Sequence, residues 1–181
     1  MKFRFHIHIS EEDYMAFNKF GQYQTPEGKK TVRLTRLLVC TMFWVAMGIV
    51  LVLKGFTLLT LITEVALAIA LVVYQLLLKS ILNRSLGRRI KELKKSGKNL
   101  YSPESIIEFY DDYFVETAAG DKTQRGYSGI EQVSIVEGKA IYIHGNIHSA
   151  YIIPYSSFES QAQYGEFLEF IKEKIATVNC Y

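Results

Sequence analysis

The chain has 181 residues, a formal net charge of +3 and a mean hydropathy of +0.09, and apolar residues make up 49% of it. These averages conceal an uneven distribution, because residues 1–100 hold 16 basic and 6 acidic side chains whereas residues 101–181 hold 5 basic and 12 acidic ones. The first half therefore has a net charge of +10 and contains long uncharged stretches, and the second half has a net charge of −7. This distribution excludes a plain soluble globule, a disordered chain and a disulfide-rich secreted domain.

The first 28 residues predict a strand followed by a helix. Ser10 stands three residues before Asp13, a spacing typical of a helix start, and the helix is expected to end near Tyr23, before Thr25-Pro26. No signal peptide is predicted, because polar and apolar residues alternate there. The strand is indicated by apolar residues at every second position: Phe3, Phe5, Ile7 and Ile9.

Two apolar stretches follow, residues 34–53 and residues 56–78. At about 1.5 Å per residue, each is long enough to cross a hydrocarbon core of roughly 30 Å. Only Lys54-Gly55 separates them, so the sequence predicts an antiparallel transmembrane hairpin. The alternative, a buried hairpin of a soluble protein, is disfavoured because both helices are apolar all round and a chain of this length has no core that could surround them.

Basic residues flank the hairpin on one side. The connection contributes only Lys54, so the positive-inside rule predicts a multi-pass protein of the cell membrane with both termini in the cytoplasm. Cys40 and Cys180 stand in no metal-binding or catalytic spacing and are interpreted as reduced thiols. The flanking basic residues are Lys29, Lys30, Arg33 and Arg36 before the first span, and Lys79, Arg84, Arg88, Arg89, Lys91, Lys94, Lys95 and Lys98 after the second.

Residues 79–98 predict a basic helix that continues the second span. Leu82, Leu86, Ile90 and Leu93 recur at helical spacing, while Arg84, Arg88, Lys91 and Lys95 line another face. Such a face attracts anionic lipid head groups by about 1 kcal/mol per basic residue. The alternative is that these charges only set the topology. Nucleic acid is not expected as a partner, because residues 101–181 carry −7 and would repel phosphate.

Residues 101–181 predict short antiparallel strands and a closing helix. Turns are expected at Asp111-Asp112, Glu137-Gly138 and Gly145-Asn146. Pro154 is expected to stop the last strand, and Ser160, with Gln163 three residues on, to begin the helix. The expected strands are 106–110, 113–117, 124–127, 130–136, 140–144 and 147–153, and the apolar stripe of the helix is Tyr164, Phe167, Leu168, Ile171 and Ile175.

The two soluble segments are expected to form one domain. Residues 101–181 alone are marginal for an independent core, and the apolar face of residues 1–28 has nothing local to pack against. Both segments lie on the same side of the predicted hairpin. We therefore expect one cytosolic domain, with the hairpin inserted after its first strand and helix.

The order of these segments resembles the YcxB-like family of small bacterial membrane proteins. The resemblance is carried by SEEDYMAF, IIEFYDDYFVE, YSGIEQVSIVEGKAIYIH and AYIIPYSSF. It implies an α+β membrane protein in which a two-helix transmembrane hairpin is inserted into a cytosolic pleckstrin-homology-like (PH-like) domain, an antiparallel bent sheet with a C-terminal helix. The family brings no established activity. Residues that match its pattern as structural positions are Tyr127, Ser128, Ile130, Ile153, Pro154 and Phe158.

Glu64 is the one ionisable residue well inside a predicted span. Such a residue costs roughly 2.5–3.5 kcal/mol to insert, so it is a functional candidate that would bind a proton or contact a second hairpin in a homo-oligomer. The alternatives are that it snorkels to the membrane surface, is simply protonated, or bonds to a polar neighbour such as Thr60.

The remaining candidates are weaker. His144 and His148 have a metal-like spacing, but Gly145-Asn146 predicts a turn between them, so a transition-metal site requires His6 and His8 to neighbour that hairpin. No nucleophile elbow, Walker loop, Rossmann glycine set or H-E-x-x-H helix occurs, so no catalytic residue, metal ligand or cofactor is predicted. The sequence favours a non-enzymatic membrane-anchored PH-like module that binds lipid or an unknown protein. The alternative is an oligomeric small transporter or channel subunit that uses Glu64.

Overall fold

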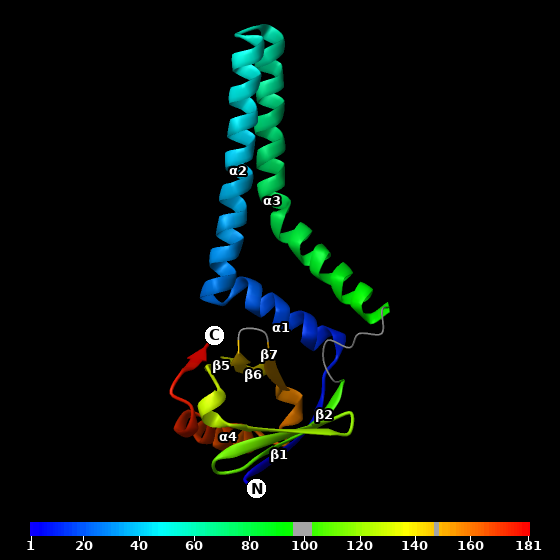
Figure 1. The fold of residues 1–181 in the computed structure, drawn as a ribbon, viewed down its shortest axis with the longest axis vertical. Coiled ribbons are helices and arrows are strands. Elements are labelled where there is room, and N and C mark those ends of the chain that lie inside the picture. Colours follow the sequence, from blue (N-terminus) through cyan, green and yellow to red (C-terminus); the bar gives the residue numbers. More distant parts are fainter. Residues whose placement is uncertain (96–102, 147–148) are drawn as a thin grey trace. The chain divides into compact units, whose positions relative to one another are not determined.

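A computed structural model describes residues 1–95, 103–146 and 149–181 of the chain (Figure 1). The chain divides into two compact units. The strand unit is Met1–Phe17 with Gly97–Tyr181, and the helix unit is Asn18–Ser96. The boundary between the two units falls inside the first helix, after Phe17.

One sheet of the strand unit has the antiparallel order β1-β2-β3-β4. The alternating pattern predicted a strand here, and Phe5 of β1 lies opposite Ile107 of β2, so this N-terminal strand joins the later residues in one sheet. The turn at Asp111-Asp112 is also present, since Phe109 pairs with Phe114 across it. The strands are β1 (Phe3–His8), β2 (Glu104–Phe109), β3 (Tyr113–Ala118) and β4 (Asp121–Gly126).

The fourth strand begins at Asp121, three residues before the predicted position 124. Its hairpin turns on Ala119 and Gly120, whose φ angles are 51° and 91°. A two-residue hairpin needs positive φ at its central residues, and alanine seldom adopts it, so Ala-Gly is a weak turn signal in a sequence. Tyr127, predicted to end this strand, instead begins the short helix η1 (Tyr127–Gly129).

The second sheet has the order β7-β6-β5-β8. Pro154 is the last residue of β7 rather than the residue after it; β7 is an edge strand, where a missing N–H group is tolerated. The strand β8 was not predicted, because a segment of three residues is too short to show an alternation of apolar and polar side chains. It pairs in parallel with β5, and Val178 lies opposite Val133. The strands are β5 (Gln132–Val136), β6 (Ala140–Asn146), β7 (Ser149–Pro154) and β8 (Val178–Cys180).

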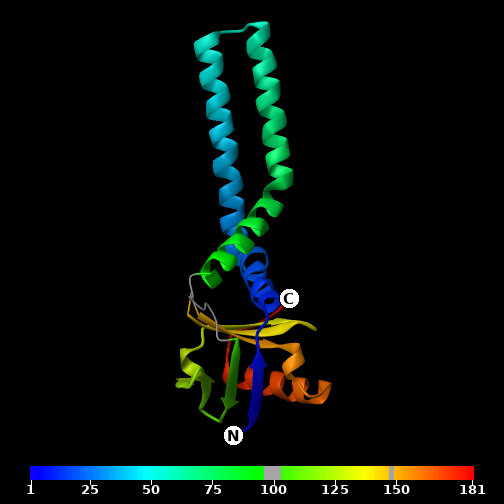
Figure 2. The same cartoon turned by 90° about the vertical axis from the view of Figure 1, so that its right-hand side faces the viewer.

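The core of the strand unit is aromatic. Helix α4 (Gln161–Lys174) begins at Ser160, whose Oγ accepts from Gln163 N at 3.2 Å, as the capping pattern predicted. From this helix, Phe167 lies 4.9 Å from the rings of both Phe5 and Phe109. Figure 2 shows α4 beside the strands. Buried or half-buried residues on its inner side are Tyr164, Phe167, Leu168, Phe170, Ile171 and Ile175.

Helix α1 (Glu11–Tyr23) starts with the predicted reciprocal cap. Asp13 N donates to Ser10 Oγ at 3.1 Å, and Ser10 N donates to Asp13 Oδ2 at 3.0 Å. The second sheet is buried on both faces: Ile135 and Ile153 face the core, and Tyr142 on the other face lies 5.1 Å from the ring of Phe17 in α1.

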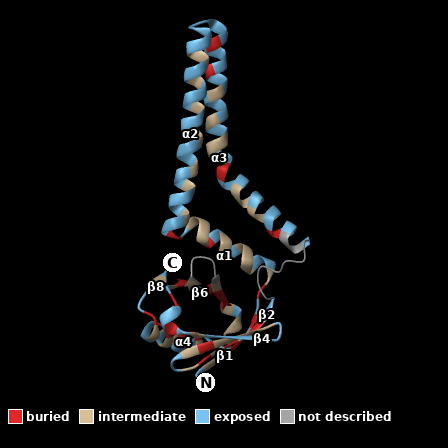
Figure 3. Cartoon of the chain, viewed as in Figure 1, coloured by how far each residue is buried: buried red, intermediate tan, exposed pale blue. Residues whose placement is uncertain are grey.

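The helix unit holds two long antiparallel helices, α2 (Pro26–Lys54) and α3 (Leu58–Lys95). Both are long and apolar enough to cross a membrane, and their side chains are largely exposed, whereas buried positions gather in the strand unit (Figure 3). The turn at Gly55 has a φ of 63°, which glycine adopts without strain. The basic segment continues α3 without a break to Lys95, as predicted; Lys98 and the side chain of Lys94 lie outside the described residues.

A tight corner joins α1 to α2. Thr25 Oγ1 accepts from Gly28 N at 3.1 Å and donates to the carbonyl oxygen of Gly21 at 2.5 Å. A Cβ atom on Gly28 would clash with that same carbonyl oxygen. The corner therefore requires glycine at position 28.

Candidate functional site

The four predicted lipid-contact residues are all exposed on α3: Arg84, Arg88, Lys91 and Lys95. At about 100° per residue they fall within an arc of roughly 60° on the helix. The ion pairs found among the described residues all lie in the strand unit, so none of them neutralises these four cations. The structure therefore presents them as one exposed positive face.

Helix α2 adds further cations at the same end of the hairpin, away from the loop at Gly55. Those exposed there are Lys29, Lys30, Arg33 and Arg36. Within residues 26–36 and 79–95, which we call the basic end, the acidic residues are Glu27 and Glu92. The basic end thus carries a strong positive charge beside two apolar helices.

The opposite side of the basic segment of α3 is apolar. Ile90 is buried and Leu82 and Leu86 are half-buried, whereas the side chain of Leu93 lies outside the described residues. Separate apolar and cationic faces are typical of a helix that lies at a membrane surface.

Tyr23 fixes the start of this basic segment. Its hydroxyl donates to Asn83 Oδ1 at 3.1 Å, and Lys79 Nζ lies 5.5 Å from the centre of its ring. Burial of this hydroxyl raises the pKa of Tyr23 above its usual value. Sequence reasoning missed this contact because the residues are 60 positions apart and no local period connects them.

Glu64 lies in the seam between α2 and α3. It is only 9% exposed, and neither carboxylate oxygen has a hydrogen-bond partner among the described residues. Thr60 is buried too, but its hydroxyl pairs with Thr57 Oγ1 at 2.8 Å. Two of the sequence alternatives are therefore wrong: the carboxyl group does not reach solvent, and it does not bond to Thr60.

One other polar contact occurs in the seam. Gln75 Nε2 donates to Cys40 Sγ at 3.1 Å. The shielded side chains of both helices recur every three or four residues, the spacing of two helices packed along a common line. They include Val39, Cys40, Phe43, Met47 and Val50 in α2, and Thr60, Glu64, Leu67, Leu71, Gln75 and Leu78 in α3.

The three histidines that the structure describes are not brought together into one site. His6 and His8 are exposed on β1 in one sheet, whereas His144 lies on β6 in the other. His144 Nε2 lies 3.2 Å from Ser134 Oγ, and burial lowers the pKa of His144 while Glu131 opposes that shift. His148 lies outside the described residues, within which no three His, Cys, Asp or Glu side chains converge on a metal-sized site.

Ser134 and His144 do not form a nucleophilic pair that a substrate could reach. Ser134 is fully buried, and it lies on β5 beside the β6 strand that carries His144. The contact therefore satisfies a buried hydroxyl across two strands.

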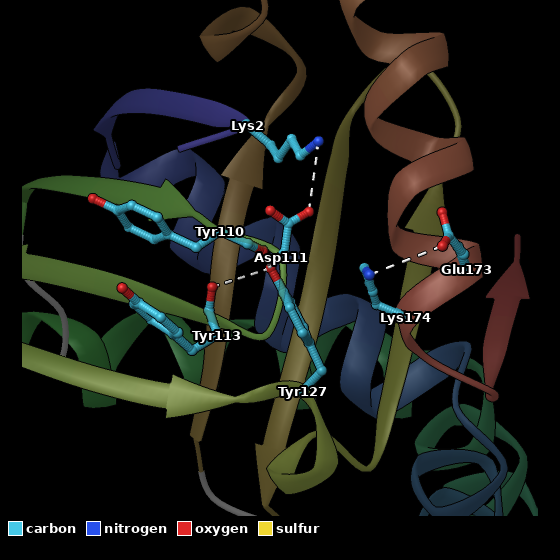
Figure 4. Close-up of polar contacts among 7 residues, drawn as sticks. All are labelled: Lys2, Tyr110, Asp111, Tyr113, Tyr127, Glu173 and Lys174. Carbon is cyan, nitrogen blue, oxygen red and sulfur yellow. Dashed lines mark hydrogen bonds and ion pairs between the residues drawn. The ribbon is translucent and has the colours of Figure 1, made fainter.

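The pair Asp111-Asp112 serves as a turn. Asp111 Oδ1 lies 3.6 Å from Lys2 Nζ, and the Tyr127 hydroxyl donates to the carbonyl oxygens of Tyr110 at 2.7 Å and Tyr113 at 3.3 Å (Figure 4). Burial, reinforced by the two aspartates, raises the pKa of the Tyr127 hydroxyl. Tyr127 therefore holds this hairpin closed.

An open hollow of about 410 Å³ lies at the ends of β1, β2 and β3, lined by His6, His8, Glu104, Thr117 and Gly120 among others. Its charged pair, His8 Nδ1 and Glu104 Oε1 at 3.8 Å, is largely exposed. Because water reaches these groups freely, the hollow supplies little electrostatic strength.

No family model matches the chain, and no curated protein or solved structure matches it. The structure brings two groups of predicted residues into one unit. Both the basic end and Glu64 belong to the α2–α3 hairpin.

Proposed function

We propose that the chain is a membrane-anchored, non-enzymatic binding module. Its hairpin spans the cell membrane, its basic end holds anionic lipid head groups, and its strand unit binds a protein partner in the cytoplasm. One observation carries this proposal: exposed cations, with no ion pair among the described residues, occupy one face of α3 directly beyond an apolar segment long enough to cross a bilayer. Attraction to an anionic surface is worth about 1 kcal/mol per such residue.

The distribution of charge supports an orientation. The basic end lies opposite the loop that holds Lys54 alone, so both termini are cytoplasmic by the positive-inside rule. A maleimide that cannot cross membranes is expected to label a Lys54→Cys variant in intact cells and to leave Cys180 unlabelled. Labelling of Cys180 from outside would refute this orientation.

The arrangement of the strand unit supports a PH-like domain. It consists of two four-stranded sheets with a helix near the C-terminus, and its first strand comes from before the hairpin. The resemblance to the YcxB-like family implied one antiparallel bent sheet, whereas the strand unit has two sheets and β8 pairs with β5 in parallel. PH-like folds host many functions, so the ligand must be identified from the surface and not from the fold.

The lipid part of the proposal is tested with the full chain in nanodiscs that mix neutral and anionic lipids. Native mass spectrometry is expected to find anionic lipids retained with the protein, and fewer with the Arg84→Gln/Arg88→Gln/Lys91→Gln/Lys95→Gln variant. The control variant, Lys122→Gln/Lys139→Gln/Lys172→Gln, removes three exposed positive charges from the strand unit and should still retain anionic lipids. Equal retention by all three proteins would refute the lipid part.

The protein part is tested by crosslinking in native membranes followed by purification of the full chain. A reproducible partner that contacts the strand unit is expected. Repeated recovery of the chain without any partner, together with no lipid preference in nanodiscs, would overturn the proposed module as a whole.

A second function, an oligomeric small transporter or channel subunit, is favoured by one observation, the buried carboxyl group of Glu64, which has no partner among the described residues. Two helices alone cannot enclose a pore, so this function requires several hairpins. Crosslinking of native membranes separates the two proposals, because only the second requires a homo-oligomer.

A further inference from the structure

We propose that the strand unit pairs with a second copy of this chain through β4, and that the charges of β4 select one antiparallel register with Thr123 at its centre. This goes beyond the proposed module, since neither lipid binding at the basic end nor a different protein on the strand unit requires a second copy.

The strand β4 is an open edge of the first sheet. Among the described residues β3 is its one paired strand, and every residue of β4 except Arg125 is exposed. The other edges are covered or short: β1 contacts β7 and the short helix η2 (Tyr155–Ser157), and β8 has three residues. An edge strand presents unpaired N–H and C=O groups to another chain. The edge best suited to pairing is therefore β4.

Alternate residues of β4 direct their main-chain groups outward. Tyr113 O accepts from Tyr110 N at 2.9 Å, so the main chain of Tyr113 faces β2. This direction alternates along a strand, so every second residue of β3 after Tyr113 faces β4 instead. The pairs formed by those residues are Phe114–Arg125, Glu116–Thr123 and Ala118–Asp121. The outward-facing main-chain groups of β4 are therefore those of Lys122, Gln124 and Gly126.

Charge complementarity selects among the possible registers. Two copies related by a twofold axis form a ladder only where outward-facing residues lie opposite one another. The registers that keep most of β4 paired are centred on Lys122, Thr123 or Gln124.

The register centred on Lys122 places two like charges directly opposite each other, which is destabilising. The register centred on Gln124 sets Arg125 opposite Thr123 and leaves Asp121 without an opposite charge. The register centred on Thr123 sets Asp121 opposite Arg125 at both ends and Thr123 opposite its own copy. Opposite charges and paired threonines both stabilise neighbouring strands. The sequence of β4 is thus complementary to itself in this one register.

The side chains of the selected register lie where they can meet. Asp121, Thr123 and Arg125 are two positions apart, so they project to one face of the sheet. Their pairs across the twofold axis are non-hydrogen-bonded pairs, in which side chains approach most closely. Neither Asp121 nor Arg125 takes part in the ion pairs found among the described residues. A second copy supplies each of them with an opposite charge.

The first test is disulfide formation by the full chain in lipid vesicles, in a background of Cys40→Ala and Cys180→Ala. Thr123→Cys should form a linked dimer under mild oxidation, because Cα atoms across a non-hydrogen-bonded pair lie about 4.5 Å apart, within reach of a disulfide. Lys122→Cys and Gln124→Cys report the other registers. They should stay unlinked, because each Cα lies about 8 Å from its own copy in the proposed register.

Three outcomes of this test would overturn the proposal. They are an unlinked Thr123→Cys, a yield at Lys122→Cys or Gln124→Cys that equals or exceeds its yield, and a Thr123→Cys chain linked only to another protein.

The second test reverses charges in the Thr123→Cys protein. Asp121→Arg should lower the yield of linked dimer about tenfold, because opposite-charge pairs become like-charge pairs. Asp121→Arg/Arg125→Asp restores the opposite charges and should recover the yield. Glu159→Arg changes the net charge equally at an exposed site outside β4 and should leave the yield unchanged. Arg125 also lies 5.8 Å from the ring centre of Tyr151, so Asp121→Arg is the deciding variant; an undiminished yield would refute the charge pairing.

The third test removes one outward N–H group. Gln124→Pro leaves the bonds to β3 in place, because proline is tolerated on an edge strand where its nitrogen faces away from the sheet. Thr123→Cys/Gln124→Pro should lose the linked dimer and keep the protease resistance of the parent. A dimer that survives this change is not joined by main-chain pairing. A dimer linked at Thr123 joins strand units, so it does not by itself support the channel subunit, which requires contacts between hairpins.

Discussion

The buried polar side chains of the strand unit and of the hairpin differ in whether they have partners. In the strand unit, the buried Ser134 hydroxyl lies beside His144, and the Tyr127 hydroxyl donates to two carbonyl oxygens. In the hairpin, Glu64 is buried with no partner at all among the described residues. Buried polar groups in folded proteins nearly always have hydrogen-bond partners, because an unpaired one destabilises the fold. A buried carboxyl group without a partner therefore points to a role other than stabilising the fold.

The two units also differ in what stabilises them. The strand unit packs fully buried rings against one another, such as Phe109 against Phe167 at 4.9 Å. The hairpin has one seam and otherwise exposes large apolar side chains such as Trp44 and Val52. One unit is therefore built to fold by its own core, and the other is suited to a surrounding lipid phase.

The largest effect is expected when the first strand is removed, because this tests whether the strand unit depends on its own core to fold. Residues 101–181 expressed alone should aggregate or stay molten, whereas residues 1–25 joined to 101–181 by a flexible linker should fold. The strand β1 buries Phe5 and Ile7, worth roughly 1.5–3 kcal/mol each, against a net stability of about 5–15 kcal/mol for a small domain.

The measurement is resistance to protease together with the dispersion of amide signals in NMR spectra. The linker is tolerable because loop-closure entropy grows only logarithmically with length. Protease-resistant, dispersed behaviour of residues 101–181 without β1 would show that the split-domain interpretation is wrong.

The next largest effect is expected from the aromatic core. Phe109→Ala should destabilise the strand unit by about 3–5 kcal/mol, because Phe109 is fully buried among Phe5, Phe114 and Phe167. Hydrogen exchange of the full chain should show faster exchange in both sheets and unchanged exchange in α2 and α3. The exposed Glu169→Ala should leave both units unchanged, and equal loss of protection in the hairpin would contradict the division into two units.

A smaller effect is expected in the helix unit. Gly28→Ala should destabilise it by about 1–3 kcal/mol, since the new Cβ atom would clash with the Gly21 carbonyl oxygen. Unfolding in mixed micelles, followed by fluorescence of the single residue Trp44, measures this loss. Gly48→Ala is the matched control in the same helix, because nothing lies within 4 Å of its added Cβ atom. An equal loss of stability in both variants would show that the clash at the α1–α2 corner is not the cause.

The smallest expected effect is a pH dependence of the strand unit. Burial lowers the pKa of His144, so the folded state binds its proton at a lower pH than the unfolded state. The contribution of neutral His144 is fully present above the ordinary value of 6.5 and is lost as the pH falls below it. The protection factors of the β5 and β6 amides, which correct exchange rates for their intrinsic pH dependence, should fall accordingly as the pH drops. His144→Gln should weaken this pH dependence, whereas the exposed His6→Gln should keep it.

Patterns that repeat within a few residues predicted much of the fold. Apolar residues at every second position predicted β1, and Ser10 and Ser160 with their partners three residues on predicted the starts of two helices. These features are local, so they need no knowledge of what packs against them. The Ala119-Gly120 turn and β8 escaped prediction, because one depends on an unusual φ and the other on pairing with a strand more than 40 residues away.

The candidate site was predicted as a set of residues and not as an arrangement. Composition alone placed cations beside two apolar helices and one carboxyl group within them. The sequence could not say that Tyr23 bonds to Asn83 or that Gln75 bonds to Cys40, since both contacts join separate helices.

By itself, the sequence of this protein determined its helices, most of its strands and the polarity of its two halves, because these follow from spacing, length and charge along the chain. Only the tertiary structure decided that β1 pairs with β2 and that Glu64 is enclosed with no partner among the described residues while Thr60 bonds elsewhere. The physical reason is that pairing and burial depend on which surfaces meet in space. Any helical sequence leaves open which face a second helix will cover.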